Sequence, residues 1–162
     1  MIDKVLLDLS KQINYLAVAN KVRISTAESC TGGLLASCLT SIEGASNYFD
    51  YGFVTYSNEA KIHMLGVEQK ILEQYGAVSE EVAIAMALRA MKISKSSISI
   101  SITGIAGPGG GSSAKPVGTV YFGIASISNT KAHLVRFTGD RSVVRYKATK
   151  EALSLLLKTL EE

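Results

Sequence analysis

The sequence is poor in the residues that build metal sites and disulfide frameworks. Its 162 residues include two cysteines, two histidines, two prolines and no tryptophan. Cys30 and Cys38 do not form a C-x-x-C pair, and two histidines are too few to complete a zinc site with them. We therefore expect no metal, no cofactor and no disulfide framework, with a reducing cytoplasm as the location.

Long apolar runs and blocks of like charge are also missing. No uninterrupted apolar stretch approaches the ~20 residues of a membrane span, and residues 1–4 lack the features of a signal peptide. The net charge is only +3, and Lys and Arg are spread along the chain instead of forming a basic block. We expect neither a membrane nor a nucleic-acid partner, and the small positive excess fits a small anionic ligand.

The remaining composition is that of an ordinary α/β domain. Hydrophobic residues make up 47% of the chain and charged residues 19%, enough for a sizeable core. Hydrophobic patterns predict alternating helices and strands that end in a hairpin. The expected helices are 2–20, 30–42, 57–65, one that begins after Ser79, and 141–160, and the expected strands are 22–27, 52–56, 98–103, 119–126 and 132–138. This order indicates a three-layer α/β/α sandwich with a mixed β-sheet.

A candidate nucleophile lies where the first expected strand ends and a helix begins. Ser29 stands there in the segment Thr-Ala-Glu-Ser-Cys-Thr-Gly-Gly, residues 26–33. Open α/β sheets bind ligands at this edge, where the N–H groups of residues 30–33 could hold an oxyanion or a phosphate. The alternative is that Ser29 only caps the helix. The segment does not match the G-x-S-x-G nucleophile elbow.

A serine nucleophile needs a base, and Lys61 is the best candidate in the sequence. Neither His63 nor His133 stands in a recognisable Ser-His-Asp order. Lys61 falls in the first turn of a short helix, whose positive pole and partial burial would both lower the pKa of the amine. Tyr56, at the end of the preceding strand, could relay a proton or position the lysine. The alternative is an ordinary solvated lysine.

The glycine-rich loop after strand 98–103 is a candidate anion site. Successive glycines can expose N–H groups to an anion, although the loop is neither a Walker loop nor G-x-G-x-x-G, and the alternative is a mobile connection. Arg141 and Arg145, one turn apart on the last expected helix, could clamp a phosphate or form a solvated face. The candidate substrate-binding residues are Cys30, Thr31, Gly32, Gly33, Thr103, Gly104, Gly107, Gly109, Gly110, Lys115, Arg141 and Arg145.

Five segments together resemble the CinA C-terminal domain family. They are residues 26–33, 52–61, 76–79, 103–111 and 115–120. The resemblance covers nearly the whole chain and implies one amidohydrolase domain of this type over residues 1–162. As in the free-standing bacterial members of the family, it implies metal-free hydrolysis of nicotinamide mononucleotide to nicotinate mononucleotide and ammonia.

The resemblance also assigns roles to individual residues. Ser29 matches the serine of the family's A-E-S-C-T-G-G motif, and Lys61 and Tyr56 match the lysine and tyrosine of its Y-S-N-x-x-K motif. It thus implies a serine–lysine mechanism in which Tyr56 assists. Gly109 stands where the family often carries an acidic residue, which leaves the role of that side chain open.

Two rival interpretations remain at this stage. Cys30 adjoins Ser29 at the expected helix start, where a thiolate would be stabilised, so a Cys30-dependent amidase is one alternative. The other is a non-catalytic nucleotide-binding module of the competence/damage-inducible type. In every case we expect a small pyridine nucleotide as the partner, and the sequence is compatible with a homo-oligomer as well as a monomer.

Overall fold

Five strands form one mixed sheet in the order β2-β1-β3-β4-β5. The structure is a computed structural model that describes residues 2–162. The strands are β1 (Ile24–Glu28), β2 (Phe49–Val54), β3 (Ile98–Gly104), β4 (Thr119–Ser126) and β5 (Thr130–Arg136). The first three strands are parallel, whereas β4 runs antiparallel to β3 and β5 antiparallel to β4. The predicted mixed sheet with a closing hairpin is therefore confirmed.

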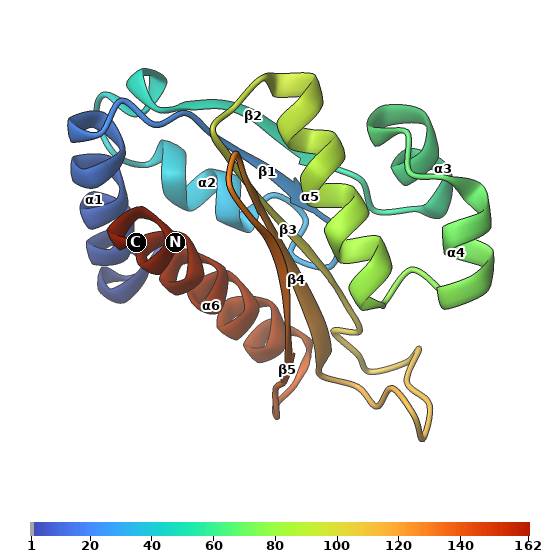
Figure 1. The fold of residues 1–162 in the computed structure, drawn as a ribbon. Helices are drawn as coiled ribbons and strands as arrows, with labels where there is room; N and C mark the ends of the chain where they lie inside the picture. Colours follow the sequence, from blue (N-terminus) through green and yellow to red (C-terminus); the bar gives the residue numbers. More distant parts are fainter. Residues whose placement is uncertain (1) are drawn as a thin grey trace.

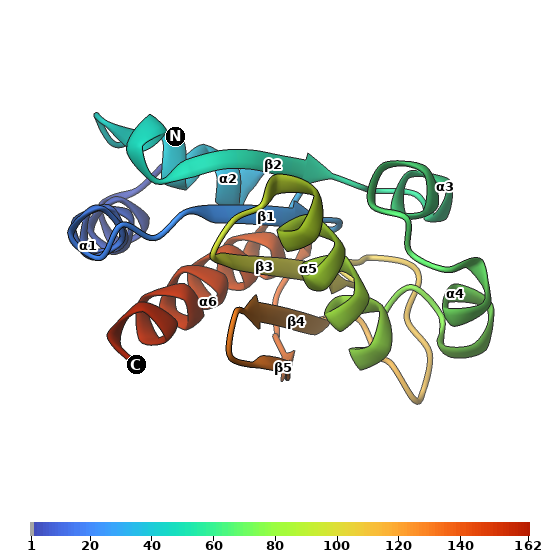
Figure 2. The same cartoon turned by 45° about the horizontal axis from the view of Figure 1, so that its top comes forward.

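Helices cover both faces of this sheet (Figures 1 and 2). One face carries α1 (Lys4–Ala19), α2 (Leu34–Thr40) and α6 (Arg141–Glu161), whose apolar side chains share one buried cluster with the strands. The other face carries α5 (Glu80–Ser94). Between β2 and α5 the chain forms α3 (Asn58–Ala60), a π-helical turn η2 (Lys61–Leu65) and α4 (Gln69–Tyr75), and a short turn η1 (Ala45–Asn47) precedes β2. The three-layer α/β/α prediction is confirmed.

The alternating sequence of β3 gives the sheet two different buried faces. The isoleucines of β3 belong to the cluster under α1, α2 and α6, while its serines have no solvent exposure. Ser101 Oγ donates to the Ala83 carbonyl of α5 at 2.6 Å and accepts from the Gly123 N–H at 3.1 Å. A Cβ atom on Gly123 would overlap the Ala83 carbonyl. Small residues therefore let α5 lie directly against β3 and β4.

Several element boundaries differ from the sequence predictions. The helix expected from residue 30 begins only at Leu34, because Gly32 and Gly33 have φ angles of +61° and +95° and form a left-handed turn before it. The strand expected at 52–56 is Phe49–Val54, so Tyr56 lies two residues past its end. Helix α4 was not predicted.

Local caps mark the helix ends between β2 and α5. The side chains of Ser57 and Ser79 accept hydrogen bonds from the N–H groups of Ala60 and Val82, and Gly66 ends η2 in the left-handed conformation. These caps fix where the chain turns between β2 and α5. No helix within residues 2–162 is long and apolar enough to cross a membrane.

Candidate active site

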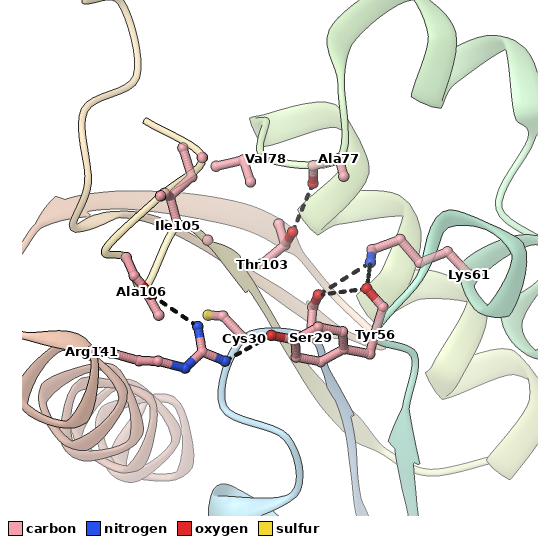
Figure 3. Close-up of a pocket in the computed structure, with 14 residues that line it drawn as sticks. Ser29, Cys30, Tyr56, Lys61, Ala77, Val78, Thr103, Ile105, Ala106 and Arg141 are labelled. Atoms are coloured by element: carbon pink, nitrogen blue, oxygen red, sulfur yellow. Dashed lines mark hydrogen bonds between the residues drawn. The ribbon is translucent and has the colours of Figure 1, made fainter. Parts of the chain in front are cut away.

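A cavity of about 270 Å³ lies at the carboxyl edge of the parallel strands (Figure 3). The segments that follow β1, β2 and β3 meet here with the N-terminus of α6. This is the edge at which open α/β sheets place their ligands. The cavity is lined by Ser29, Cys30, Tyr56, Lys61, Ala77, Val78, Thr103, Gly104, Ile105, Ala106, Gly107, Gly109, Gly110 and Arg141.

Ser29 is held at this edge by the sheet itself. It follows the last residue of β1, and its N–H donates to the Ile102 carbonyl of β3 at 2.9 Å, which extends the β1–β3 ladder by one bond. The residue is buried, with 8% of its surface exposed, and that exposure faces the cavity. A serine fixed in this way presents its hydroxyl to a ligand without needing to move.

Lys61 reaches the Ser29 hydroxyl from the neighbouring strand connection. Its Nζ lies 3.1 Å from Ser29 Oγ, and it donates to the carbonyl of Thr55 at 2.9 Å and to that of Tyr56 at 3.3 Å. Only 1% of the lysine is exposed, although no carboxylate pairs with it within the described chain. Burial lowers the pKa of Lys61 from its usual 10.5 to about 8, because the ammonium loses its hydration.

Tyr56 contributes to the site through two different groups. Its main-chain carbonyl faces both Lys61 Nζ and, at 3.5 Å, Ser29 Oγ. Its phenol points the other way and accepts from the Arg141 guanidinium at 2.8 Å, and Arg141 also donates to the Gly107 carbonyl at 3.1 Å. The contact predicted between Tyr56 and Lys61 is therefore made by the backbone, and the phenol instead joins one wall of the cavity to α6 (Figure 3).

Glu28 is a residue whose role the sequence reasoning missed. It is fully buried, and its carboxylate accepts from Thr31 Oγ1 at 2.7 Å and from the N–H groups of Gly33, Leu35 and Ala36 at 2.8–3.1 Å. The N-terminus of α2 thus already holds an anion from the protein's own chain. The available signal was a charged residue inside an otherwise buried strand.

This arrangement removes the start of α2 from the candidate anion site. The Gly32 N–H donates to the Ser29 carbonyl and the Gly33 N–H to Glu28, so neither is free for a ligand. Thr31, Gly32 and Gly33 are not among the residues that line the cavity. The N–H of Cys30 has no acceptor within residues 2–162, and Cys30 lines the cavity, which leaves this group as the candidate oxyanion donor.

Two of the predicted phosphate ligands also lie elsewhere. The Arg145 guanidinium donates to the carbonyls of Cys30 and Thr31 at 3.1 and 2.9 Å and does not line the cavity. Lys115 Nζ donates to the Tyr75 carbonyl at 3.0 Å. Arg145 therefore holds the turn after Ser29, Lys115 ties the glycine loop to α4, and only Arg141 of the three lines the cavity.

The glycine loop forms one wall of the cavity, as the sequence suggested. Ala106 and Gly107 are buried there, and across the described residues nothing accepts a hydrogen bond from the N–H of either residue or from those of Gly109 and Gly110. A Cβ on Gly107, whose φ is +84°, would meet Val117, whereas nothing lies within 4 Å of a Cβ on Gly109. The loop thus offers several unused donors at the rim.

Cysteine and histidine chemistry receive no support from the geometry. Burial, together with the nearby negative charge of Glu28, raises the pKa of the Cys30 thiol to about 11, so a thiolate is disfavoured. His63 is exposed, and His133 is half-buried, with Nε2 unpaired within the described chain. Neither histidine lines the cavity, and no group of three His, Cys, Asp or Glu within residues 2–162 could hold a metal.

The fold and the site together define a class of protein: an α/β/α sandwich with a buried serine–lysine pair in a small cavity at the carboxyl edge of its sheet. The sequence model of the CinA C-terminal domain matches residues 6–160. The chain belongs to this family.

The chain is similar to relatives of two lengths. It is 48% identical over 159 residues to a protein of Escherichia coli K12 named nicotinamide-nucleotide amidohydrolase PncC, and the match covers 96% of this chain and 95% of that protein. It is also 48% identical over 152 residues to a putative competence-damage inducible protein of Caldicellulosiruptor bescii, of which it spans only 37%. The crystal structure of the competence/damage inducible protein CihA from Agrobacterium tumefaciens superposes with a TM-score of 0.96 at 40% identity, covering 100% of this chain and 99% of that one.

Proposed function

We propose that the protein hydrolyses the carboxamide of nicotinamide mononucleotide to give nicotinate mononucleotide and ammonia. The observation that carries this proposal is the 3.1 Å contact between Lys61 Nζ and Ser29 Oγ inside a cavity. The substrate comes from the full-length likeness to the E. coli protein named nicotinamide-nucleotide amidohydrolase.

Counting the hydrogen bonds of Lys61 supports its role as the base. A neutral amine has two N–H donors and one lone pair. The carbonyls of Thr55 and Tyr56 take two N–H donors, and in the ammonium form the third N–H donates to Ser29 Oγ. When the amine is neutral, a lone pair takes the place of this third donor and faces the Ser29 hydroxyl. With a pKa of about 8, about one Lys61 in ten is neutral at pH 7. Lys61 therefore accepts the Ser29 proton as the hydroxyl attacks.

The remaining steps use groups next to this pair. The bond from Ser29 Oγ to the carboxamide carbon forms, and the N–H of Cys30 holds the resulting oxyanion. Lys61 returns its proton to the nitrogen, the carbon–nitrogen bond breaks and ammonia leaves. Water then adds to the acyl-enzyme, with its proton passing to Lys61. Lys61 returns this proton to Ser29 Oγ as the ester bond breaks, which releases the acid and restores the serine.

The rest of the nucleotide extends along the glycine loop. A cavity of about 270 Å³ is just below the usual ~300–1,000 Å³ of ligand pockets, so it takes the pyridine ring while the ribose phosphate reaches its rim. There the phosphate meets the Arg141 guanidinium and the unused N–H groups of Gly109 and Gly110. Arg141 gives up its contact with the Tyr56 phenol or the Gly107 carbonyl in exchange.

An ammonia-release assay with nicotinamide mononucleotide tests the proposal. The wild-type protein and a Ser37→Ala control, which removes an exposed serine of α2, release ammonia at the same rate. Ser29→Ala binds the nucleotide and loses at least ~1,000-fold in kcat, as expected for the loss of a nucleophile. Nucleotide binding without ammonia release by the wild-type protein would favour a binding module instead, and activity that depends on Cys30 would favour a thiol amidase.

A further inference from the structure

The hydroxyl group of Thr103 has its hydrogen committed to the protein. Thr103 Oγ1 lies 2.7 Å from the Ala77 carbonyl oxygen. A carbonyl can only accept, so the hydroxyl must donate in this bond. Thr103 is 1% exposed and lines the cavity, and Figure 3 shows the bond to Ala77 directed away from Ser29. Only the lone pairs of Thr103 Oγ1 therefore remain available to a ligand.

Thr103 flanks Ser29 on the side opposite Lys61. The strand order places β1 between β2 and β3, so Ser29 follows the central strand of the three. Lys61 approaches from the β2 side through the Thr55 and Tyr56 carbonyls, whereas Thr103 belongs to β3. The bond from Ser29 N–H to the Ile102 carbonyl brings Ser29 level with Thr103. A carboxamide carbon placed at Ser29 Oγ thus has Thr103 Oγ1 beside either its oxygen or its NH₂ group.

We propose that Thr103 Oγ1 accepts a hydrogen bond from the NH₂ group of the substrate carboxamide, and so selects an amide over the carboxylate product. The proposal rests on the amidase function above and adds a specificity-determining residue to it. An amide offers two N–H donors to a group that can only accept. A carboxylate offers only acceptors, so its oxygen meets the Oγ1 lone pairs without a hydrogen between them.

The same contact serves the leaving group. When Lys61 has passed its proton to the nitrogen, the departing amine carries positive charge and still donates to Thr103 Oγ1. A charge-assisted bond is stronger than a neutral one, so the contact is worth more at this step than in the substrate complex. After ammonia departs, neither the acyl-enzyme nor the acid formed by its hydrolysis can donate this bond, so product release is favoured.

Two substitutions separate the hydroxyl from the shape of the side chain. Thr103→Val keeps the volume and removes the acceptor, whereas Thr103→Ser keeps the acceptor. Thr119→Val is the matched control, because Thr119 is also 1% exposed and donates to a main-chain carbonyl, that of Pro116 at 2.6 Å, but does not line the cavity.

The measurements are kcat/KM for nicotinamide mononucleotide and the inhibition constant of nicotinate mononucleotide. We expect Thr103→Val to lose about 10-fold or more in kcat/KM, while its inhibition constant for the acid falls by about 3-fold or more. Thr103→Ser and Thr119→Val stay within about 3-fold of the wild type in both values. An inhibition constant that is unchanged or higher in Thr103→Val would overturn the proposal, because a merely structural role weakens the binding of both ligands.

A ligand-side measurement needs no substitution at Thr103. In 3-acetylpyridine mononucleotide a methyl group replaces the NH₂ of the carboxamide. On the Ser29→Ala protein, calorimetric titration should show the amide binding about 3-fold or more tighter than this ketone and than the acid. Equal affinities would overturn the proposal. This binding order can be measured even if the wild-type protein releases no ammonia, a result that would refute the amidase function alone.

Discussion

Replacing Glu28 by glutamine should destabilise the fold by about 4 kcal/mol. Oε2 accepts from Thr31 Oγ1 and from the N–H groups of Gly33 and Leu35, while Oε1 accepts from the Ala36 N–H at 2.8 Å. With its amide oxygen in the place of Oε2, glutamine turns its NH₂ toward the Ala36 N–H. One buried donor is then unsatisfied, at about 1–3 kcal/mol, and three charged hydrogen bonds become neutral, at about 1 kcal/mol each before relaxation.

Urea unfolding followed by circular dichroism measures this loss. A loss of about 4 kcal/mol is a large share of the ~5–15 kcal/mol typical of a domain, and the unfolding midpoint should move down by about 1–4 M if the slope is unchanged. Glu43→Gln is the control, because Glu43 is an exposed glutamate whose side chain has no hydrogen-bond partner in the part of the chain that the structure describes. It should stay within about 0.5 kcal/mol of the wild type.

A loss below about 1 kcal/mol for Glu28→Gln would refute this reasoning. It would mean that the start of α2 does not depend on the carboxylate. The N-terminus of that helix would then be available to a ligand anion, contrary to the site described above.

Three further predictions concern the reaction. Because burial lowers the pKa of Lys61, the fraction of neutral Lys61, and with it kcat/KM, should rise with pH through about 8. Lys61→Arg should be inactive, because a guanidinium stays charged. A pH-independent kcat/KM or an active arginine variant would exclude Lys61 as the base. Because the pKa of Cys30 is about 11, iodoacetamide at pH 7 should leave ammonia release unchanged for hours, and rapid inactivation would contradict this. The kcat/KM for nicotinamide riboside should be on the order of 100-fold lower than that for the mononucleotide, and the value for free nicotinamide should be lower still. Equal values for the riboside and the mononucleotide would show that the phosphate is not bound in the way proposed.

Features governed by neighbouring residues could be predicted from the sequence. Ser57 and Ser79 cap helices through their own side chains, and Gly66 ends a helix because its φ is positive. The alternation of strands and helices followed from hydrophobic period alone. Predicting that Ser29 and Lys61 lie together needed one further argument, namely that the carboxyl ends of parallel strands meet at one edge of the sheet. The family resemblance supported the same pairing.

Contacts between distant segments could not be predicted. Arg145 lies 115 residues from Cys30 in the chain, and nothing near it in sequence shows that two carbonyls already occupy its guanidinium. An anion site at Gly32 and Gly33 could be predicted because the sequence does not show which acceptors already bind their N–H groups. Glu28 takes one of them from only five residues away, but only the fold turns its carboxylate onto α2.

The central claim is that Ser29 forms an acyl-enzyme during amide hydrolysis, and mass spectrometry of acid-quenched turnover mixtures tests it most directly. The protein is mixed with nicotinamide mononucleotide, quenched within milliseconds to seconds, digested and sequenced. We predict an adduct equal in mass to the nucleotide minus ammonia on the peptide that carries Ser29, and none in the Ser29→Ala protein. Ammonia release by Ser29→Ala at the wild-type rate, or the same adduct on Cys30, would contradict the account.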